Sequence, residues 1–165
     1  MRILMLVRHA KSSWDYPELS DFERPLNPRG RRDAPAIAAR LKKAGLAPDR
    51  LVSSPALRAI TTAHLFAQAF GLRIEDIELN SNIYEASPQA LIHLIRLFPD
   101  EDREVMLFGH NPGISQAAHV LAECPFDEMA TTGAARIELN VKSWAQVKPG
   151  VGKVLRYEQP GKKKN

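Results

Sequence analysis

The chain has 165 residues, of which 44% are hydrophobic and 25% charged, values typical of one globular domain with its own core. Its apolar runs fall short of the roughly 20 residues that a membrane helix needs, and the run at residues 3–7 is too short for a signal-peptide core. A single cysteine, Cys124, excludes an intramolecular disulfide and a cysteine-rich metal site. We therefore expect a cytoplasmic protein that has no membrane partner.

The formal net charge of +4 is concentrated at one end of the chain. The three lysines at 162–164 supply +3, and the remaining 20 basic residues nearly balance the 19 acidic ones. A nearly neutral body argues against a nucleic-acid partner. We expect a single domain over residues 1–160, followed by a basic, frayed tail over residues 161–165.

The first half of the chain alternates apolar runs with helical segments. Residues 3–7 form a continuous apolar run, which predicts a buried strand. After a polar loop, Asn27–Pro28 is typical of an N-cap followed by proline and predicts a helix to about residue 44. The next predicted elements are a strand at 50–53, a helix from Ser54–Pro55 to Gly71 and a strand at 74–79.

The second half continues this alternation. Ser87–Pro88 opens a predicted helix that Pro99 closes, and a buried strand follows at 104–108. Asn111–Pro112 opens a helix that fades near residues 123–125. The last predicted elements are strands at 135–141 and 153–157. This order predicts an α/β fold with three layers (α/β/α) and a largely parallel central sheet.

Polar side chains follow three of the predicted strands at the point where each strand ends. His9 comes directly after the first strand, Ser53–Ser54 close the second, and His110 follows the strand at 104–108. Because ligands of open α/β sheets bind beyond the carboxyl ends of the strands, we expect these side chains to meet at one edge.

Arg58 stands in a predicted first helical turn, where a cation opposes the helix dipole. An anion bound at that helix terminus would explain it, and the planar guanidinium suits a phosphate. Phosphoryl transfer needs neutralised oxygens and a nucleophile, and a neutral imidazole can be that nucleophile. No metal is required, and the spacing of the histidines predicts no metal site.

Four motifs in the first 125 residues together resemble a known family. They are Val7–Ser12 (VRHAKS), Arg24–Gly30 (RPLNPRG), Ser53–Ala59 (SSPALRA) and Gly109–Pro112 (GHNP). In this order and spacing they resemble the histidine phosphatase (phosphoglycerate mutase-like) superfamily. The short chain is similar to its small branch, the SixA-type phosphohistidine phosphatases.

The resemblance implies a phosphoglycerate mutase-like fold, no cofactor, and a role for each matching residue. His9 would be the phosphorylated nucleophile. Arg8 and Arg58 would bind the phosphate, and His110 would stabilise the transferring group. Ser12 falls in the loop that lines the phosphate pocket in relatives, so its hydroxyl is expected to donate there.

Two features of the family pattern, the glycine after the nucleophile and the general acid, are not directly matched in this chain. Many relatives have glycine after the nucleophilic histidine, whereas this chain has Ala10, whose backbone must keep φ negative. Relatives also commonly use a carboxylic acid to protonate the leaving oxygen. Glu85 is the candidate for that acid, with Asp15 and Asp21 in reserve; Glu85 could equally be an ordinary acidic residue near a helix start.

The sequence therefore predicts a metal-independent phosphatase that acts through a covalent phosphohistidine on His9. Its expected substrate is phosphohistidine on a protein, because a chain of this size leaves little room for lid insertions over a small metabolite. Two alternatives stay open: a phosphatase of a small phosphorylated metabolite, and a phosphate-binding regulatory module without turnover.

Overall fold

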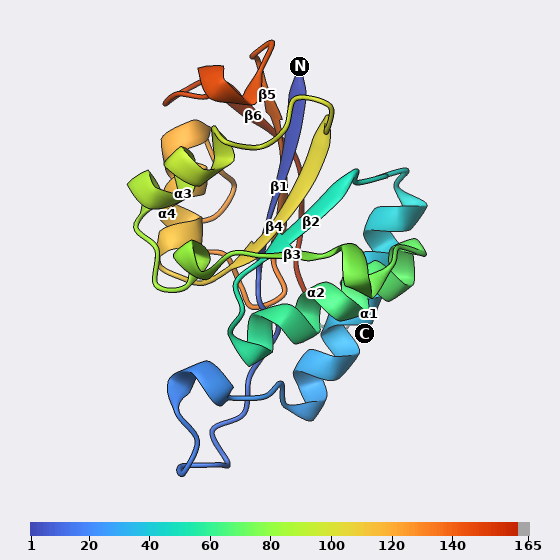
Figure 1. Ribbon diagram of the computed structural model, residues 1–165. Helices are drawn as coiled ribbons and strands as arrows, with labels where there is room; N and C mark the ends of the chain where they lie inside the picture. Colours follow the sequence, from blue (N-terminus) through green and yellow to red (C-terminus); the bar gives the residue numbers. More distant parts are fainter. Residues whose placement is uncertain (162–165) are drawn as a thin grey trace.

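The computed structural model describes residues 1–161, and within them a central sheet is covered by helices on both faces (Figure 1). The six strands of this part of the chain lie in the order β3-β2-β4-β1-β5-β6. The predicted three-layer α/β fold is therefore confirmed. The basic tail predicted for residues 161–165 lies, from residue 162 onward, outside the described residues.

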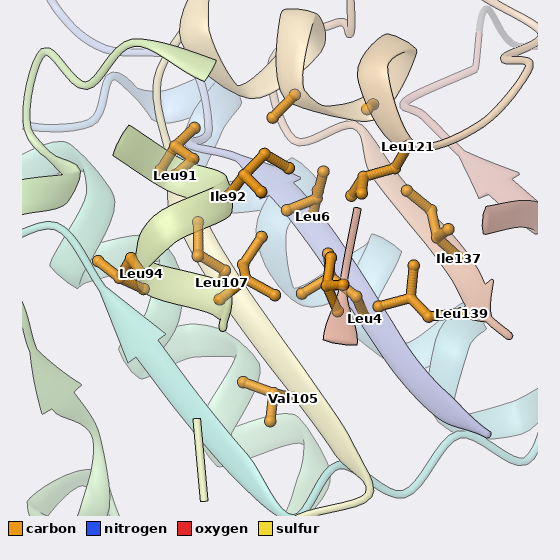
Figure 2. Close-up of a cluster of buried hydrophobic side chains, with 14 of the residues drawn as sticks. Leu4, Leu6, Leu91, Ile92, Leu94, Val105, Leu107, Leu121, Ile137 and Leu139 are labelled. Atoms are coloured by element: carbon orange, nitrogen blue, oxygen red, sulfur yellow. The ribbon is translucent and has the colours of Figure 1, made fainter. Parts of the chain in front are cut away.

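The two central strands, β1 (Arg2–Arg8) and β4 (Glu104–Gly109), are parallel and buried on both faces. Because successive side chains of a strand point to opposite faces, each strand feeds two cores. Leu4, Leu6, Val105 and Leu107 lie in one core, which Figure 2 shows. The other core takes the alternate side chains Met5, Val7, Met106 and Phe108.

The outer strands differ in direction on the two sides of this centre. Strands β2 (Arg50–Ser53) and β3 (Glu78–Leu79) run parallel to β4, whereas β5 (Ala134–Leu139) and β6 (Gly152–Glu158) form an antiparallel edge. The sheet is therefore largely parallel, as predicted. The carboxyl ends of β1, β2 and β4 meet at a single edge of the sheet.

The helices cover the sheet in two pairs (Figure 1). The first pair, α1 (Pro28–Lys43) and α2 (Leu57–Phe70), packs over the core that contains Phe108. The second pair, α3 (Pro88–Ile95) and α4 (Gly113–Leu121), packs over the core of Figure 2. Among the described residues, no helix has the length and apolar character needed to cross a bilayer.

All four predicted helices are present, but the predicted polar cap is confirmed for two of them and wrong for the other two. Asn27 and Ser87 cap α1 and α3, each accepting a hydrogen bond from a backbone N–H three residues later. The predicted start at Ser54–Pro55 is wrong, because the Ser54 hydroxyl accepts from the Ala56 N–H in a turn and the helix begins at Leu57. The predicted start at Asn111–Pro112 is wrong as well. The Asn111 amide binds Met129 and Ser115 instead, and α4 begins at Gly113.

The predicted strand at 74–79 is mostly wrong. Ile74–Asp76 forms a 3-10 turn, and the two residues of β3 pair with Val52 and Ser53 of β2. The helix predicted to close at Pro99 ends at Ile95, although Phe98 still packs in the core. These errors leave the strand ends that position the candidate site unchanged.

Candidate active site

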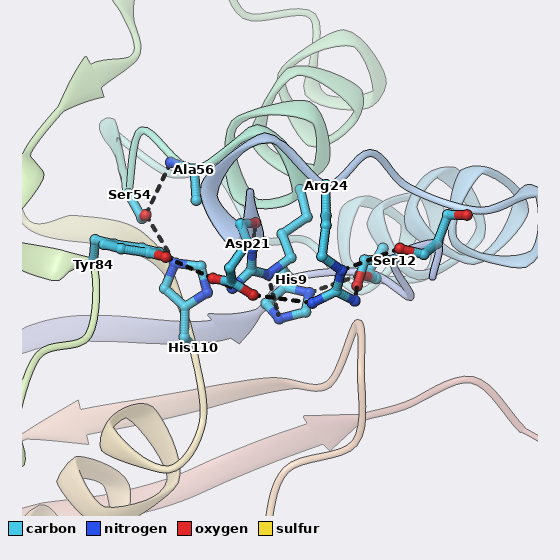
Figure 3. A network of polar contacts seen from close by, with 11 residues as sticks. His9, Ser12, Asp21, Arg24, Ser54, Ala56, Tyr84 and His110 are labelled. Carbon is cyan, nitrogen blue, oxygen red and sulfur yellow. Dashed lines mark hydrogen bonds and ion pairs between the residues drawn. The ribbon is translucent and has the colours of Figure 1, made fainter. Parts of the chain in front are cut away.

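Three strand ends bring two histidines and a serine together at the carboxyl edge of the sheet. His9 follows β1, Ser54 follows β2 and His110 follows β4. The centroids of the two imidazole rings lie 5.2 Å apart, and Figure 3 shows both rings close to Asp21. The predicted convergence of these side chains is therefore what the structure contains.

The contacts of His9 determine which ring nitrogen is available for chemistry. Its Nδ1 lies 2.7 Å from the carbonyl oxygen of Ala10, and because a carbonyl can only accept, Nδ1 must carry the proton. The lone pair is therefore on Nε2. Burial, together with the charges of the neighbouring His110, Arg58 and Arg8, lowers the pKa of His9 to about 3, so the ring is neutral at pH 7. A neutral imidazole with a free Nε2 is the nucleophilic form.

Two buried segments hold the His9 ring in place. The Ala10 N–H donates to the Thr62 hydroxyl of α2 at 2.9 Å, and Ala10 keeps a negative φ as expected. On the other side, α1 lies against the same loop: a Cβ on Gly30 would meet the Lys11 carbonyl oxygen at 2.2 Å. Only glycine fits this close approach, which accounts for Gly30 in the RPLNPRG segment.

Two guanidinium groups lie near the His9 ring, and that of Arg58 contacts its unprotonated nitrogen. Arg58, in the first turn of α2, donates from Nε to His9 Nε2 at 3.4 Å. Arg8, at the end of β1, donates from Nη1 to the Met129 carbonyl, and its buried Nε has no partner among the described residues. Burial lowers the pKa of Arg8, and the nearby Glu128 and Tyr157 offset this effect only in part. The site thus has positive charge in reserve for an anion.

Within residues 1–161, His110 contributes a second buried nitrogen without a hydrogen-bond partner, after the Nε of Arg8. Its Nε2 shares a hydrogen bond of 2.8 Å with the Ser54 hydroxyl, whereas its buried Nδ1 has no partner among the described residues. Burial and the charge of Arg58 lower the pKa of His110 to about 4. An incoming phosphate would reverse this effect, because a negative charge favours the protonated ring.

The loop before α1 closes one side of the pocket through Arg24. This guanidinium donates to the Ser12 hydroxyl at 2.5 Å, to the Ser13 carbonyl and to the Asp21 carboxylate, and it stacks on the exposed Trp14 ring. The Ser12 hydroxyl therefore serves as an acceptor for Arg24. Its predicted donation to a phosphate stays a prediction.

Glu85 stands apart from the polar contacts of the pocket. Its side chain is exposed and makes no hydrogen bond within residues 1–161, although its neighbour Tyr84 packs edge-on against His110. The backbone of Glu85 has a φ of 57°, a conformation that costs a non-glycine residue of the order of 1 kcal/mol. Its assignment as the general acid stays a prediction.

Sequence reasoning missed several residues of the pocket. Asp21 was named only as a reserve acid, yet its carboxylate contacts Arg58, Arg24 and Tyr84 (Figure 3). Tyr84 and Thr62 carry no motif, and their contacts span 63 and 52 positions of the chain. Arg24 could have been found from the sequence, because it lies inside the RPLNPRG motif. In the structure it is a buried charge.

The fold and this edge of the sheet define a phosphoglycerate mutase-like protein. A family model for the histidine phosphatase superfamily (branch 1) matches residues 4–91, more than half of the chain. The chain belongs to this superfamily, and a phosphatase is the class of enzyme that the match supports.

Individual proteins agree with this assignment. An uncharacterised protein of Mycobacterium tuberculosis is 31% identical over 93% of this chain and 99% of its own. A structure described as a candidate phosphohistidine phosphatase SixA from Agrobacterium tumefaciens has a TM-score of 0.80 and 28% identity, covering 97% of this chain and 99% of its own. The protein histidine phosphatase SixA in complex with tungstate has a TM-score of 0.79 at 20% identity, covering 94% and 95%, and shares the fold.

The described residues also bear on metal binding. Within residues 1–161, no group of three histidine, cysteine, aspartate or glutamate side chains is arranged to hold a metal ion. The positive groups around His9 are the side chains that can neutralise a phosphate. Metal independence stays a prediction for the enzyme assay.

Proposed function

We propose that this protein hydrolyses phosphohistidine on a protein through a covalent phosphohistidine intermediate on His9. The observation that carries the proposal is the state of the His9 ring: its proton is held at Nδ1 by the Ala10 carbonyl, and its Nε2 lone pair lies beside Arg58. A buried, neutral imidazole next to two cations is suited to attack phosphorus.

The proposed reaction has two steps. In the first, His9 Nε2 forms a bond to phosphorus while the bond from phosphorus to the substrate nitrogen breaks, and the leaving imidazole takes up a proton from solvent water, which the second step returns. In the second, water attacks the phosphoryl group on His9, which releases inorganic phosphate and restores the ring. Arg8, Arg58 and His110 would neutralise the phosphoryl oxygens in both steps.

The depth of the site supports a side chain of another protein as the substrate. His9 is 7% exposed, whereas the neighbouring Asp21 side chain is 50% exposed, so the nucleophile lies just below an accessible part of the surface. A phosphorylated side chain can reach such a site from solvent. Ser12 and Glu85 are proposed to assist as phosphate ligand and as acid for ester substrates, and the cytoplasmic location stays a prediction.

The test compares phosphohistidine proteins, an aryl phosphate and phosphorylated metabolites by kcat/KM. We expect phosphohistidine to be the preferred substrate, His9→Ala to abolish turnover of every substrate, and EDTA to leave the wild-type rate unchanged. Acid-labile phosphate on the wild-type chain, absent from His9→Ala, would identify the intermediate.

Each other outcome has a definite meaning. Preference for a metabolite would replace the substrate and keep the mechanism. Phosphate binding without any turnover would establish a binding module, and turnover by His9→Ala would remove His9 as the nucleophile.

A further inference from the structure

Asp21 is the carboxylate that connects the loop before α1 to the phosphate pocket. It lies in the short 3-10 turn η1 (Asp21–Glu23), and its side chain is half exposed at the rim. Its Oδ2 accepts from Arg58 Nη2 at 3.0 Å and from the Tyr84 hydroxyl at 2.6 Å, while Oδ1 accepts from Arg24 Nη1 at 3.1 Å. Arg58 and Tyr84, 37 and 63 positions away in the sequence, therefore reach the same carboxylate as the neighbouring Arg24. Figure 3 shows Asp21 between Tyr84 and Arg24.

The contacts with Arg58 divide its guanidinium into two edges. The far edge, Nη1 and Nη2, donates to the main-chain oxygen of Asp21 at 2.7 Å and to its carboxylate at 3.0 Å. The Nε nitrogen, on the other edge, points at His9 Nε2. A planar guanidinium gripped at its far edge has a fixed plane, so its remaining N–H groups have a fixed direction.

From this geometry we propose that Asp21 is a positioning residue for the phosphoryl transfer, an inference that rests on the proposed function of His9. Asp21 holds Arg58 by the far edge, and the Nε edge remains for the oxygens of the phosphoryl group on His9. Asp21 itself stays outside the bonds that form and break.

The charge state of Asp21 agrees with this role. Hydrogen bonds from Tyr84 and Arg58 lower the pKa of Asp21 to about 2, so its carboxylate is ionised at neutral pH and acts as an acceptor. An ionised carboxylate has no proton to give to a leaving group. Since Tyr84 and Arg24 also hold it, Asp21 is itself fixed before substrate arrives.

Asp21 could instead occupy the phosphate position as an internal anion, and the two roles predict opposite changes in phosphate affinity. In that case its removal would tighten the binding of phosphate. If Asp21 positions Arg58, its removal must weaken binding, because Arg58 loses its orientation. The sign of the change in affinity therefore separates the two readings.

The experiment is a double-mutant cycle on the full chain. The affinity for inorganic phosphate is measured by calorimetry, and kcat/KM is measured with aryl phosphates of differing leaving groups. We expect Asp21→Ala to weaken phosphate binding and to lower kcat/KM by about 10-fold, with the same factor for good and poor leaving groups. In the Arg58→Ala background, Asp21→Ala should have almost no further effect.

Two further variants keep the test decisive. Asp21→Asn retains an oxygen acceptor and nearly the same shape, so it should lose less than Asp21→Ala, and it replaces that variant if the alanine chain does not fold. Glu18→Gln removes a charge from an exposed position of the same loop and should leave both measurements unchanged.

Several results would overturn the proposal. Tighter phosphate binding by Asp21→Ala would make Asp21 an internal competitor, additive losses with Arg58→Ala would separate the two residues, and a loss confined to poor leaving groups would make Asp21 an acid. Phosphate affinity does not require turnover. The cycle therefore remains interpretable if phosphohistidine hydrolysis itself is not observed.

Discussion

The two ends of the central sheet both contain partly buried arginines, but the partners of these arginines differ. At the amino end, Arg50 donates to the carboxylates of Asp102 and Glu78, and the hydrogen bond to Asp102 raises the pKa of Arg50. At the carboxyl end, Arg8 donates to a carbonyl oxygen, and burial lowers its pKa. The carboxylates around Arg50 stabilise the fold, whereas Arg8 donates to a neutral oxygen and Arg58, although paired with Asp21, directs its Nε toward His9, so both can still bind an anion.

The strongest test of this contrast replaces one arginine at each end. Arg58→Ala should lower kcat/KM for an aryl phosphate by about 10²- to 10³-fold, because a preorganised donor to the phosphoryl oxygens is lost. Arg50→Ala should lower the melting temperature and leave kcat/KM within about 2-fold of wild type, because Asp102 and Glu78 lie far from the chemistry. Equal kinetic losses would abolish the contrast between the two ends.

A second test asks whether Glu85, at the carboxyl end, acts as a general acid. If Glu85 protonates the leaving oxygen, Glu85→Gln should lower hydrolysis of esters with poor leaving groups by about 10²-fold, with a smaller loss on phosphohistidine, whose ring nitrogen is easily protonated. Glu101→Gln, an exposed glutamate at the other end, serves as the control. Equal, small losses on both substrates would remove Glu85 from the site.

The histidines make the carboxyl end sensitive to acid. His9 and His110 have pKa values of about 3 and about 4, below their ordinary value of 6.5. Between pH 6.5 and these values the unfolded chain binds protons that the folded chain does not, so stability falls as pH falls. The expected loss is on the order of a few kcal/mol by pH 4, measured by urea unfolding.

The control for this pH dependence is His110→Gln, which should flatten the slope between pH 6.5 and pH 4. Inorganic phosphate should also reduce the loss, because a bound anion favours the protonated ring. A slope that is identical in wild type and His110→Gln would assign the acid sensitivity to other groups.

The smallest expected effect concerns the packing that holds the His9 loop. Gly30→Ala gains a little helix propensity, but its Cβ would overlap the Lys11 backbone, so we expect a net destabilisation of about 1 to 3 kcal/mol and reduced activity. Gly161→Ala, where a Cβ meets open space, should change neither. Unchanged stability of Gly30→Ala would mean that the loop moves without cost.

The parts of the molecule that were predicted from sequence are those governed by local rules. The apolar run at 3–7 formed β1, and Asn27 capped α1, because burial and capping act within a few residues. The predicted helix cap at Ser54 was wrong because its hydroxyl accepts from Ala56 in a turn and contacts His110. The contact with His110 depends on the tertiary structure.

The site shows the same division. The strand ends place His9, Ser54 and His110 at one edge, and the family match covers the motifs around His9 and Ser54. The link between Asp21 and Tyr84 could not be predicted, because it depends on how a loop and a turn 63 residues apart meet in space. Spacing in the sequence contains no information on such a contact.

Thr62 has a consequence for how the site responds to motion. Its hydroxyl accepts from the Ala10 N–H and donates to the Arg58 carbonyl at 2.7 Å, so one buried side chain joins the strand of the nucleophile to the helix of its arginine. A displacement of α2 is therefore transmitted to the backbone beside His9. The relative position of His9 and Arg58 is fixed by the fold before a substrate binds.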